Sequence, residues 1–212
     1  IKPSALFDLK IKPKLLLVDG NMQKLTDINQ ISIIKGDTKS QSIAAASIIA
    51  KVYRDRIMKE YSKIFPEYDL AQNNGYGTKS HILAIKEYFS TPIHRKTFKP
   101  ASNFLPRFKD ITNISLLSLQ ISSSNLVKDG HTIVFIDLLN SFRIDLISKY
   151  EDRYNIFILD RETNNINEVV RKEIDNVPIE ENIKKDILCS INISLISISY
   201  LKNKPRVIYT SI

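Results

Sequence analysis

A continuous apolar run that ends in an acidic residue and a glycine constrains the fold of this chain more than any other feature. Residues 14–18 read Lys-Leu-Leu-Leu-Val, and Asp19 and Gly20 follow directly. A short uninterrupted apolar run bounded by a turn signal is typical of a strand buried on both faces, as in a parallel sheet. The carboxyl end of such a strand is where an α/β protein places its functional residues. We therefore expect an α/β chain with Asp19 beside a site.

A second carboxylate follows a second β-like run. Residues 31–34 read Ile-Ser-Ile-Ile, and Lys35, Gly36 and Asp37 come next. From residue 42 to residue 61 apolar side chains recur at helical spacing, which predicts a long helix. Its apolar members are Ala45, Ile49, Val52, Tyr53 and Ile57. A further helix is expected over residues 80–88, after a turn-rich segment that contains Gly75, Tyr76 and Gly77.

The two carboxylates form a candidate metal site. Hard divalent cations take several oxygen ligands, and carboxylates at the ends of neighbouring strands can meet around one ion although they are distant in sequence. The alternative for each residue alone is structural, because Asp19 before a glycine suits a turn and Asp37 suits a local cap. Tyr76 is likewise either a packed loop residue or, between two glycines, a ring that can stack on a sugar or base.

Charge and cysteine content restrict partner and compartment. Residues 1–110 hold 19 Lys and Arg against 10 Asp and Glu, whereas residues 111–212 hold 12 against 13. A basic half favours a polyanionic partner, although a merely soluble basic surface is the alternative. A single cysteine, Cys189, excludes an intramolecular disulfide framework and fits a reducing compartment, so the cytoplasm is expected. No apolar run approaches the roughly 20 residues of a membrane span, and the first residues do not read as a signal peptide.

The composition also changes along the chain. Three prolines, Pro92, Pro100 and Pro106, interrupt a basic stretch from residue 91 to residue 110, after which Ile, Ser, Asn and Leu dominate. We therefore predict two domains, residues 1–110 and residues 111–212.

Taken together, the motifs of the first domain resemble bacterial ribonuclease HII over roughly residues 5–105. The segments that carry the resemblance are Val18-Asp19-Gly20, Lys35-Gly36-Asp37, residues 42–52 with Arg54-Asp55, Phe65-Pro66-Glu67-Tyr68, Gly75-Tyr76-Gly77-Thr78, His81 and residues 94–98. The resemblance implies an RNase H fold and endonucleolytic cleavage of RNA in RNA–DNA hybrids, including single ribonucleotides embedded in duplex DNA. It also implies Mn²⁺ or Mg²⁺ as cofactor, held by four carboxylates.

By the same resemblance, individual residues take expected roles. Asp19 and Asp37 match two of the four metal-binding, catalytic carboxylates, and Tyr76 matches the tyrosine that stacks on the ribose at the cleaved junction. Lys35, Ser40 and Ser42 are expected near phosphates. His81 and His94 lack metal-ligand spacing and are interpreted as structural or phosphate-side.

One departure from the family pattern concerns activity. The Asp-Glu-Ala-Gly-Arg-Gly signature, which supplies the other two carboxylates, has no counterpart in the sequence, so the RNase H-like sheet is expected without its N-terminal strands. Hydrolysis with two metal ions needs carboxylates that hold both ions and orient a water. A chain with two of the four carboxylates is therefore expected to bind metal weakly and to have little activity.

The second domain is similar to the small YraN family, which resembles restriction endonucleases in fold. The resemblance rests on residues 126–133, 142–147, 154–158 and 206–212. Arg143 stands where the family has Gly-Glu, and Leu159-Asp160-Arg161 replaces Glu-Val-Lys, so Asp145 is the acid that remains and this domain is expected to be catalytically inactive. An unrelated small α/β domain is the alternative.

Two further hypotheses compete with the enzyme. The basic first half alone would support a non-catalytic nucleic-acid-binding or decayed fusion protein. The second half could also dock onto the first as a structural cap, in which case deletion of residues 111–212 would cause aggregation or a large loss of stability. The sequence leaves the oligomeric state open.

Overall fold

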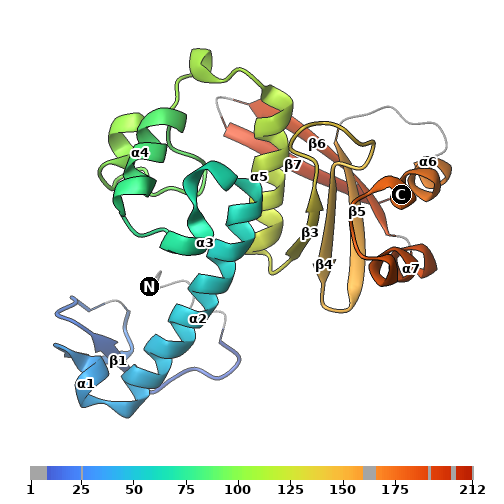
Figure 1. Ribbon diagram of the computed structural model, residues 1–212. Coiled ribbons are helices and arrows are strands. Elements are labelled where there is room, and N and C mark those ends of the chain that lie inside the picture. Colours follow the sequence, from blue (N-terminus) through green and yellow to red (C-terminus); the bar gives the residue numbers. More distant parts are fainter. Residues whose placement is uncertain (1–8, 25, 160–165, 191, 202–203, 212) are drawn as a thin grey trace. The chain divides into compact units, whose positions relative to one another are not determined.

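The chain forms two compact units, Ile1–Arg56 and Ile57–Ile212. The computed structural model describes residues 9–24, 26–159, 166–190, 192–201 and 204–211. It confirms a mixed α/β class, with a two-stranded sheet in the first unit and a five-stranded sheet in the second (Figure 1). The predicted domain boundary near residue 110 falls within the second unit and stays a prediction.

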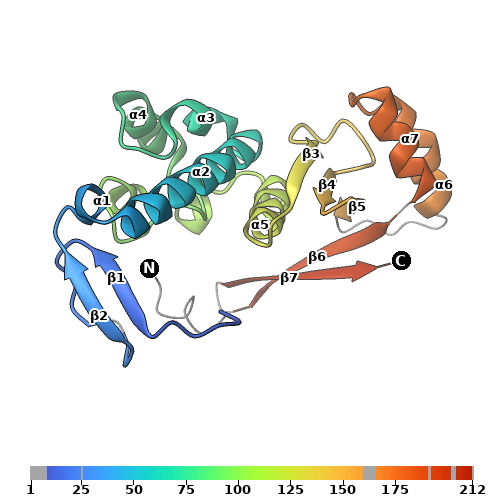
Figure 2. The ribbon, with the colours of Figure 1, turned by 90° about the horizontal axis from the view of Figure 1, so that it is seen from below.

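The first unit contains the two strands that were expected to carry the carboxylates. Strands β1 (Leu15–Asp19) and β2 (Asn29–Ile33) are parallel, with Asp19 opposite Ile33. A short helix, α1 (Gly36–Lys39), follows β2, and the long helix α2 (Gln41–Ile64) begins two residues later (Figure 2). Helix α2 continues into the second unit. The predicted strands and the predicted long helix are therefore confirmed within a few residues.

The burial of β1 differs from the prediction. Val18 is buried, but Leu15 and Leu17 keep 48% and 39% of their surface exposed. The expectation of a strand buried on both faces is wrong for the described residues, because β1 there has a single neighbouring strand and no layer covers its second face. An apolar run therefore predicts the strand, whereas burial depends on the elements beside it.

The helical part of the second unit begins with the last turns of α2. Its further elements are η2 (Pro66–Tyr68), α3 (Leu70–Asn73), α4 (Lys79–Tyr88), η3 (Ala101–Phe104), η4 (Phe108–Asp110) and α5 (Ile114–Lys128). Helices α4 and α5 begin at side-chain caps, because Thr78 Oγ1 accepts from His81 N and Asn113 Oδ1 accepts from Leu116 N. The helix predicted over residues 80–88 is confirmed.

The five-stranded sheet is mixed and follows sequence order. Its strands are β3 (Thr132–Ile136), β4 (Leu146–Tyr150), β5 (Arg153–Leu159), β6 (Ile193–Leu201) and β7 (Lys204–Ser211). Among the described strands of this sheet, β5 and β6 are the one parallel pair, and their connection contains α6 (Ile166–Glu173), η5 (Ile174–Asn176) and α7 (Glu181–Cys189). A parallel pair needs such a crossover, since a tight turn can join only antiparallel strands.

Alternating side chains divide the second unit into two cores. Leu146 and Phe157 pack with α5 and with the end of α2, whereas Ile147 and Ile156 pack with α6 and α7. The alternation follows from the two-residue period of a strand. Figure 2 shows α5 on one side of β3, β4 and β5, and α6 and α7 on the other side. The end of the long helix thus shares a core with the sheet.

Two buried polar features complete this shared core. Glu60 Oε2 accepts from Ile133 N at 2.7 Å, and Lys63 Nζ donates to Ile133 O at 2.6 Å and to Glu60 Oε2 at 3.0 Å. Both backbone groups of Ile133 are therefore satisfied by one turn of α2. In α5, three consecutive buried serines, Ser122 to Ser124, each donate to the carbonyl four residues earlier, so a polar run can lie in a buried helix.

Candidate metal centre and nucleic-acid loop

The carboxylate of Asp19 is bonded to the segment that carries Asp37. Asp19 Oδ1 accepts a hydrogen bond from Gly36 N at 2.7 Å, and Gly20 N donates to Ile33 O at 2.9 Å. Parallel pairing brings the carboxyl ends of β1 and β2 to the same edge, and this is how the contact forms across 17 residues. Both aspartates are exposed. The structure therefore brings Asp19 and the Lys35-Gly36-Asp37 segment together.

Two backbone features make the contact possible. Lys35 adopts a left-handed conformation, with φ of 54° and ψ of 49°, and its carbonyl accepts from Thr38 N and Thr38 Oγ1. Gly36 lies so close to its neighbours that a Cβ there would be 2.7 Å from Ile43 Cδ1 and 3.2 Å from Asp19 Oδ1. The strained turn at Lys35 and the missing side chain at Gly36 thus let the Gly36 amide reach the carboxylate.

The three residues expected near phosphates differ in their surroundings. Ser40 ends α1, and its hydroxyl accepts a long hydrogen bond from Ile43 N at 3.5 Å in the first turn of α2. Ser42 and Lys35 are exposed. The hydroxyl of Ser40 therefore has a structural use as a helix cap, whereas the side chains of Ser42 and Lys35 are exposed.

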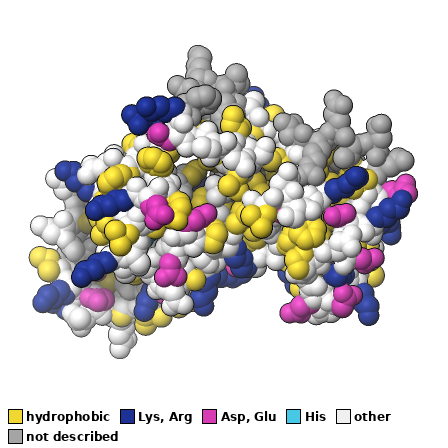
Figure 3. Space-filling view, turned by 45° about the horizontal axis from the view of Figure 1, so that its top comes forward, with side chains coloured by type: hydrophobic (Ala, Val, Ile, Leu, Met, Phe, Trp, Pro, Cys, Tyr) yellow, Lys and Arg dark blue, Asp and Glu magenta, His cyan; other side chains and the backbone are white. Residues whose placement is uncertain are grey.

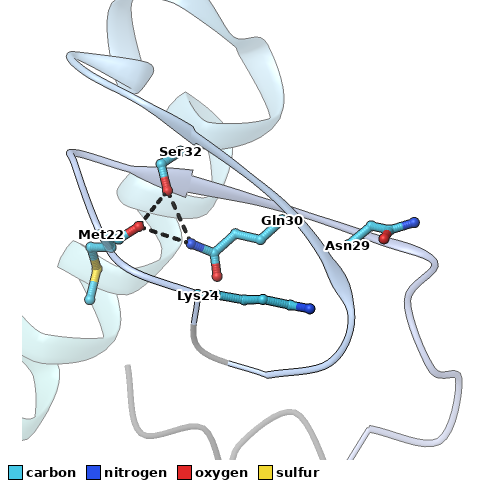
Figure 4. A pocket seen from close by; sticks show the side chains of 5 residues that line it. All are labelled: Met22, Lys24, Asn29, Gln30 and Ser32. Atoms are coloured by element: carbon cyan, nitrogen blue, oxygen red, sulfur yellow. Dashed lines mark hydrogen bonds between the residues drawn. The ribbon is translucent and has the colours of Figure 1, made fainter.

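The described part of the first unit also has a pocket, but it lies apart from the aspartates. It is lined by Met22, Lys24, Asn29, Gln30 and Ser32 (Figure 4). Gln30 Nε2 donates to Met22 O at 3.2 Å and to Ser32 Oγ at 3.0 Å, and Ser32 Oγ donates to Met22 O at 2.9 Å. These hydrogen bonds hold the loop after β1 against β2, so the residues that line the pocket stabilise the strand pair.

Tyr76 lies in the second unit, on a loop that is held by its neighbours. The Asn73 carbonyl accepts from Tyr76 N at 2.8 Å, and Asn73 Oδ1 accepts from Gly75 N at 2.8 Å. Gly75 has a φ of 71°, which favours glycine. The side chain of Tyr76 is 57% exposed. A fixed backbone with an accessible ring is suited to stacking.

A pair of histidines fastens this loop. His81 Nδ1 lies 2.9 Å from Tyr76 O, and His81 Nε2 lies 3.1 Å from His94 Nε2. A carbonyl only accepts, so His81 Nδ1 carries a proton and its Nε2 accepts from His94 Nε2. His94 Nδ1 then accepts from Thr91 N at 3.1 Å. Both rings are neutral in this chain of bonds. The structural interpretation of His81 and His94 fits this geometry, but the sequence analysis missed that they pair, since 13 residues separate them.

The His94 ring is expected to make the stability of the folded chain depend on pH. Burial, and then the repulsion between two protonated rings that the neighbouring His81 would cause, lower the pKa of His94 from 6.5 to about 4. Because the unfolded chain takes up this proton at a higher pH than the folded chain, stability is present above pH 6.5 and falls as the pH drops toward 4. We expect His94→Gln to flatten the dependence of the melting temperature on pH between 6.5 and 4.5. Thermal unfolding of both proteins at several pH values measures this difference.

A matched control separates His94 from the other groups that titrate in this range. Burial also lowers the pKa of His131, whose ring Nδ1 lies 2.8 Å from Ser148 Oγ. His131→Gln should leave the part of the pH dependence that belongs to His94 in place. If His94→Gln and the wild-type protein show the same pH dependence, the proposed neutral pair is contradicted.

One face of the surface carries charges of both signs. On the face that Figure 3 shows, Lys and Arg side chains are interspersed with acidic and hydrophobic ones among the described residues. Within the described ranges, no group of three or more His, Cys, Asp or Glu side chains could hold a metal ion. None of the described helices is long and apolar enough to cross a membrane.

Asp19 ends β1 and is hydrogen-bonded to the segment that carries Asp37, and Tyr76 is an exposed ring on a glycine loop of an α/β chain. Residues 4–101 match the family model described as Ribonuclease HII. Every candidate site residue of the first domain, from Asp19 to Tyr76, lies within this match. This part of the chain is therefore similar to ribonuclease HII.

Curated relatives agree with the family match. A ribonuclease HII of Lactobacillus helveticus (strain DPC 4571) is 59% identical over 96 residues, which are 45% of this chain and 38% of the relative. A ribonuclease HII of Caldanaerobacter subterraneus subsp. tengcongensis is 56% identical over 94 residues, 44% of this chain and 39% of the relative. The chain thus spans about two fifths of the length of these relatives.

Proposed function

We propose that this chain carries part of an endoribonuclease that cleaves the RNA strand of RNA–DNA hybrids, and embedded ribonucleotides in duplex DNA, by metal-assisted phosphodiester hydrolysis. The observation that carries the proposal is the hydrogen bond from Gly36 N to Asp19, because it brings Asp19 to the segment that carries Asp37 within the matched region. A cytoplasmic location fits the single cysteine, Cys189, which is free.

The donor set suits a hard divalent cation. Asp19 and Asp37 are exposed carboxylates, and each offers oxygen lone pairs of the kind that Mg²⁺ and Mn²⁺ prefer. These two residues would hold the ion, whose Lewis acidity supplies the activation of a water and the neutralisation of phosphate charge. The Gly36 amide would orient the Asp19 carboxylate. Tyr76 would stack on the ribose, and Lys35, Ser40 and Ser42 would contact phosphates.

We further propose that activity is impaired with these two carboxylates alone. Two carboxylates leave most positions around an ion to water, and the described residues add no third acidic, histidine or cysteine ligand nearby. A non-catalytic nucleic-acid-binding or decayed fusion protein is the second candidate. The basic balance of residues 1–110 favours it, since such charge binds phosphates whether or not hydrolysis follows.

Cleavage of a duplex with one embedded ribonucleotide, in Mn²⁺, tests the enzyme. We expect weak cutting by the wild-type chain and a loss of about 10- to 100-fold or more in Asp19→Asn, because loss of a ligand should cost at least as much as loss of its supporting contact. Asp27→Asn is the matched control, since Asp27 is an exposed aspartate of the same unit. Equal background cutting by the wild-type chain and Asp19→Asn would remove the enzyme proposal for this chain and leave the binding protein.

For residues 111–212 we propose a degenerate YraN-like, restriction-endonuclease-like domain without catalysis. The mixed sheet and its helices are compatible with that fold. Asp145 is buried, and its Oδ2 accepts from Leu159 N at 2.8 Å, so this carboxylate links the start of β4 to the end of β5. Asp137, also buried, accepts from Phe142 N at 2.6 Å. Asp160 and Arg161 lie outside the described residues.

A further inference from the structure

The backbone carbonyl of Tyr76 joins the loop that carries this residue to helix α4. Two donors meet at this oxygen, since Thr78 N lies 2.8 Å from Tyr76 O and His81 Nδ1 lies 2.9 Å from it. His81 belongs to the first turn of α4, where its own amide donates to the Thr78 cap at 3.2 Å. The peptide that follows Tyr76 is therefore oriented by a ring that a helix holds in place.

This contact comes from a buried side chain, whereas the ring of Tyr76 is exposed. His81 is 4% exposed, and Tyr76 is 57% exposed. Glycines on both sides of Tyr76 restrict the backbone least, so its conformation must be fixed by contacts and not by local sterics. A Cβ added at Gly77 would be 4.0 Å from Ile82 Cδ1, which is ordinary van der Waals contact. His81 thus supplies from α4 a restraint that the glycines do not.

The second ring, His94, determines where the first ring carries its proton. His94 Nδ1 lies 3.1 Å from Thr91 N and 2.8 Å from Thr91 Oγ1, and His94 Nε2 lies 3.1 Å from His81 Nε2. A backbone amide only donates, so His94 Nδ1 accepts and His94 Nε2 carries the proton. His81 Nε2 must then accept, which leaves the proton of His81 on Nδ1, where it faces the Tyr76 carbonyl.

The backbone that leads to His94 is held in a conformation that residues other than glycine rarely adopt. Phe89 has a φ of 67° and a ψ of −176°. The Tyr68 hydroxyl donates to the carbonyls of Tyr88 at 3.0 Å and Phe89 at 2.7 Å, and the centroids of the Tyr68 and His94 rings are 5.2 Å apart. Such strain persists only where surrounding contacts hold it, and it is frequent at binding and catalytic sites. The strained segment and the exposed ring are connected through the two histidines.

We propose that His81 and His94 are positioning residues for Tyr76. His81 holds the Tyr76 carbonyl, His94 keeps the proton of His81 on Nδ1, and together they present the Tyr76 ring to nucleic acid in the orientation that stacking needs. A ring held in advance loses less conformational freedom on binding than a mobile one. The proposal rests on the proposed function, in which Tyr76 stacks on a ribose, and it assigns no chemical step to either histidine.

A crossed exchange of two amide side chains tests this assignment. The amide nitrogen of asparagine is bonded to Cγ, as imidazole Nδ1 is, whereas that of glutamine lies one bond further out, as Nε2 does. At position 81 the required donor is Nδ1, so His81→Asn should keep the contact with Tyr76 O and His81→Gln should lose it. At position 94 the required donor is Nε2, so the order should reverse, and His94→Gln should bind better than His94→Asn.

Two measurements follow the four variants. Fluorescence anisotropy without metal gives the affinity for a labelled duplex with one embedded ribonucleotide and for the same duplex made entirely of DNA. We expect His81→Gln and His94→Asn to weaken binding of the ribonucleotide duplex at least about fivefold, the lower end of what one aromatic stack contributes. Amide exchange in residues 75–78 should become faster in the same two variants, whereas His81→Asn and His94→Gln should stay close to the wild-type protein.

Two further variants separate positioning from a general loss of stability. In a chain that carries Tyr76→Leu, His81→Gln should weaken binding no further, because the position of an absent ring has no effect. His131→Gln is the matched control, since the His131 ring contacts Ser148 in β4 and not the loop of Tyr76, and it should leave both measurements unchanged.

The proposal is overturned if asparagine and glutamine rank in the same order at positions 81 and 94, or if His81→Gln is as harmful without the Tyr76 ring as with it. Since each position has its own pair of amides, an unfolded variant at one position leaves the other pair to decide. If the wild-type chain binds both duplexes equally, the proposed function fails for Tyr76. Unchanged amide exchange in His81→Gln would then overturn the positioning role as well, whereas faster exchange would leave it standing.

Discussion

A chain shortened to end at Asp110 is expected to lose its cooperative unfolding transition and to aggregate. Ile64 and Phe65 are 0% and 1% exposed in a core that they share with residues of α5 and the five-stranded sheet. Fully uncovering such a side chain costs about 1.5–3 kcal/mol, and several of them together approach the whole stability of a typical domain, about 5–15 kcal/mol. Differential scanning calorimetry and light scattering of the shortened and full chains measure the effect.

A milder pair of variants keeps this prediction testable if the shortened chain is insoluble. Leu146 and Ile187 are both almost fully buried, but Leu146 belongs to the core shared with α2, and Ile187 belongs to the core on the other face of the sheet. Each change to alanine should cost about 2–5 kcal/mol. Only Leu146→Ala should speed amide exchange locally in residues 61–85. A soluble shortened chain that melts within a few degrees of the full chain would contradict the shared core.

Replacement of Glu60 by leucine is expected to give the second large effect. Glu60 is 9% exposed, and it accepts from the amide of Ile133 and from Lys63. Leucine leaves a buried amide without its acceptor, which costs about 1–3 kcal/mol, and leaves Lys63 without its anion beside the sheet. We therefore expect a loss of about 2–4 kcal/mol in the free energy of unfolding by urea.

A graded series identifies which part of the Glu60 contact matters. Glu60→Gln keeps an oxygen for the Ile133 amide and removes only the charge, so it should cost clearly less than Glu60→Leu. Glu67→Gln is the control, because Glu67 is an exposed carboxylate on the neighbouring η2. Equal losses for Glu60→Leu and Glu67→Gln would show that the contact with Ile133 contributes nothing measurable.

The elements with strong local signals could be predicted from the sequence. Periodicity predicts α2, the apolar run predicts β1, and the rule that parallel strands end at one edge predicts that Asp19 meets the segment of Asp37. Residue types alone also suggested the exposed Tyr76 ring, because flanking glycines leave a ring accessible. These signals are local, or depend on one pairing of neighbouring strands.

Features that depend on distant neighbours could not be predicted. The spacing of Ile49 and Val52 indicates a helix face, but it does not say what covers that face, and both residues are exposed. Nothing in the local sequence pairs His81 with His94 or Glu60 with Ile133, which is 73 residues away. The left-handed conformation of Lys35 could not be predicted, because it occurs at a lysine and not at a glycine. A lysine adopts this conformation only when the surrounding contacts hold it there.

The contact of Glu60 and Lys63 with Ile133 has a consequence for how such a chain can evolve. β3 is an edge strand of the described five-stranded sheet, and these two side chains occupy a backbone donor and acceptor that could otherwise pair with a strand of another molecule. A different domain joined after residue 110 would have to offer Glu60 a hydrogen-bond donor and Lys63 an acceptor, as Ile133 does. Recombination at residue 110 should therefore give folded proteins only with domains that offer these two groups. Fusions with other domains should tend to self-associate.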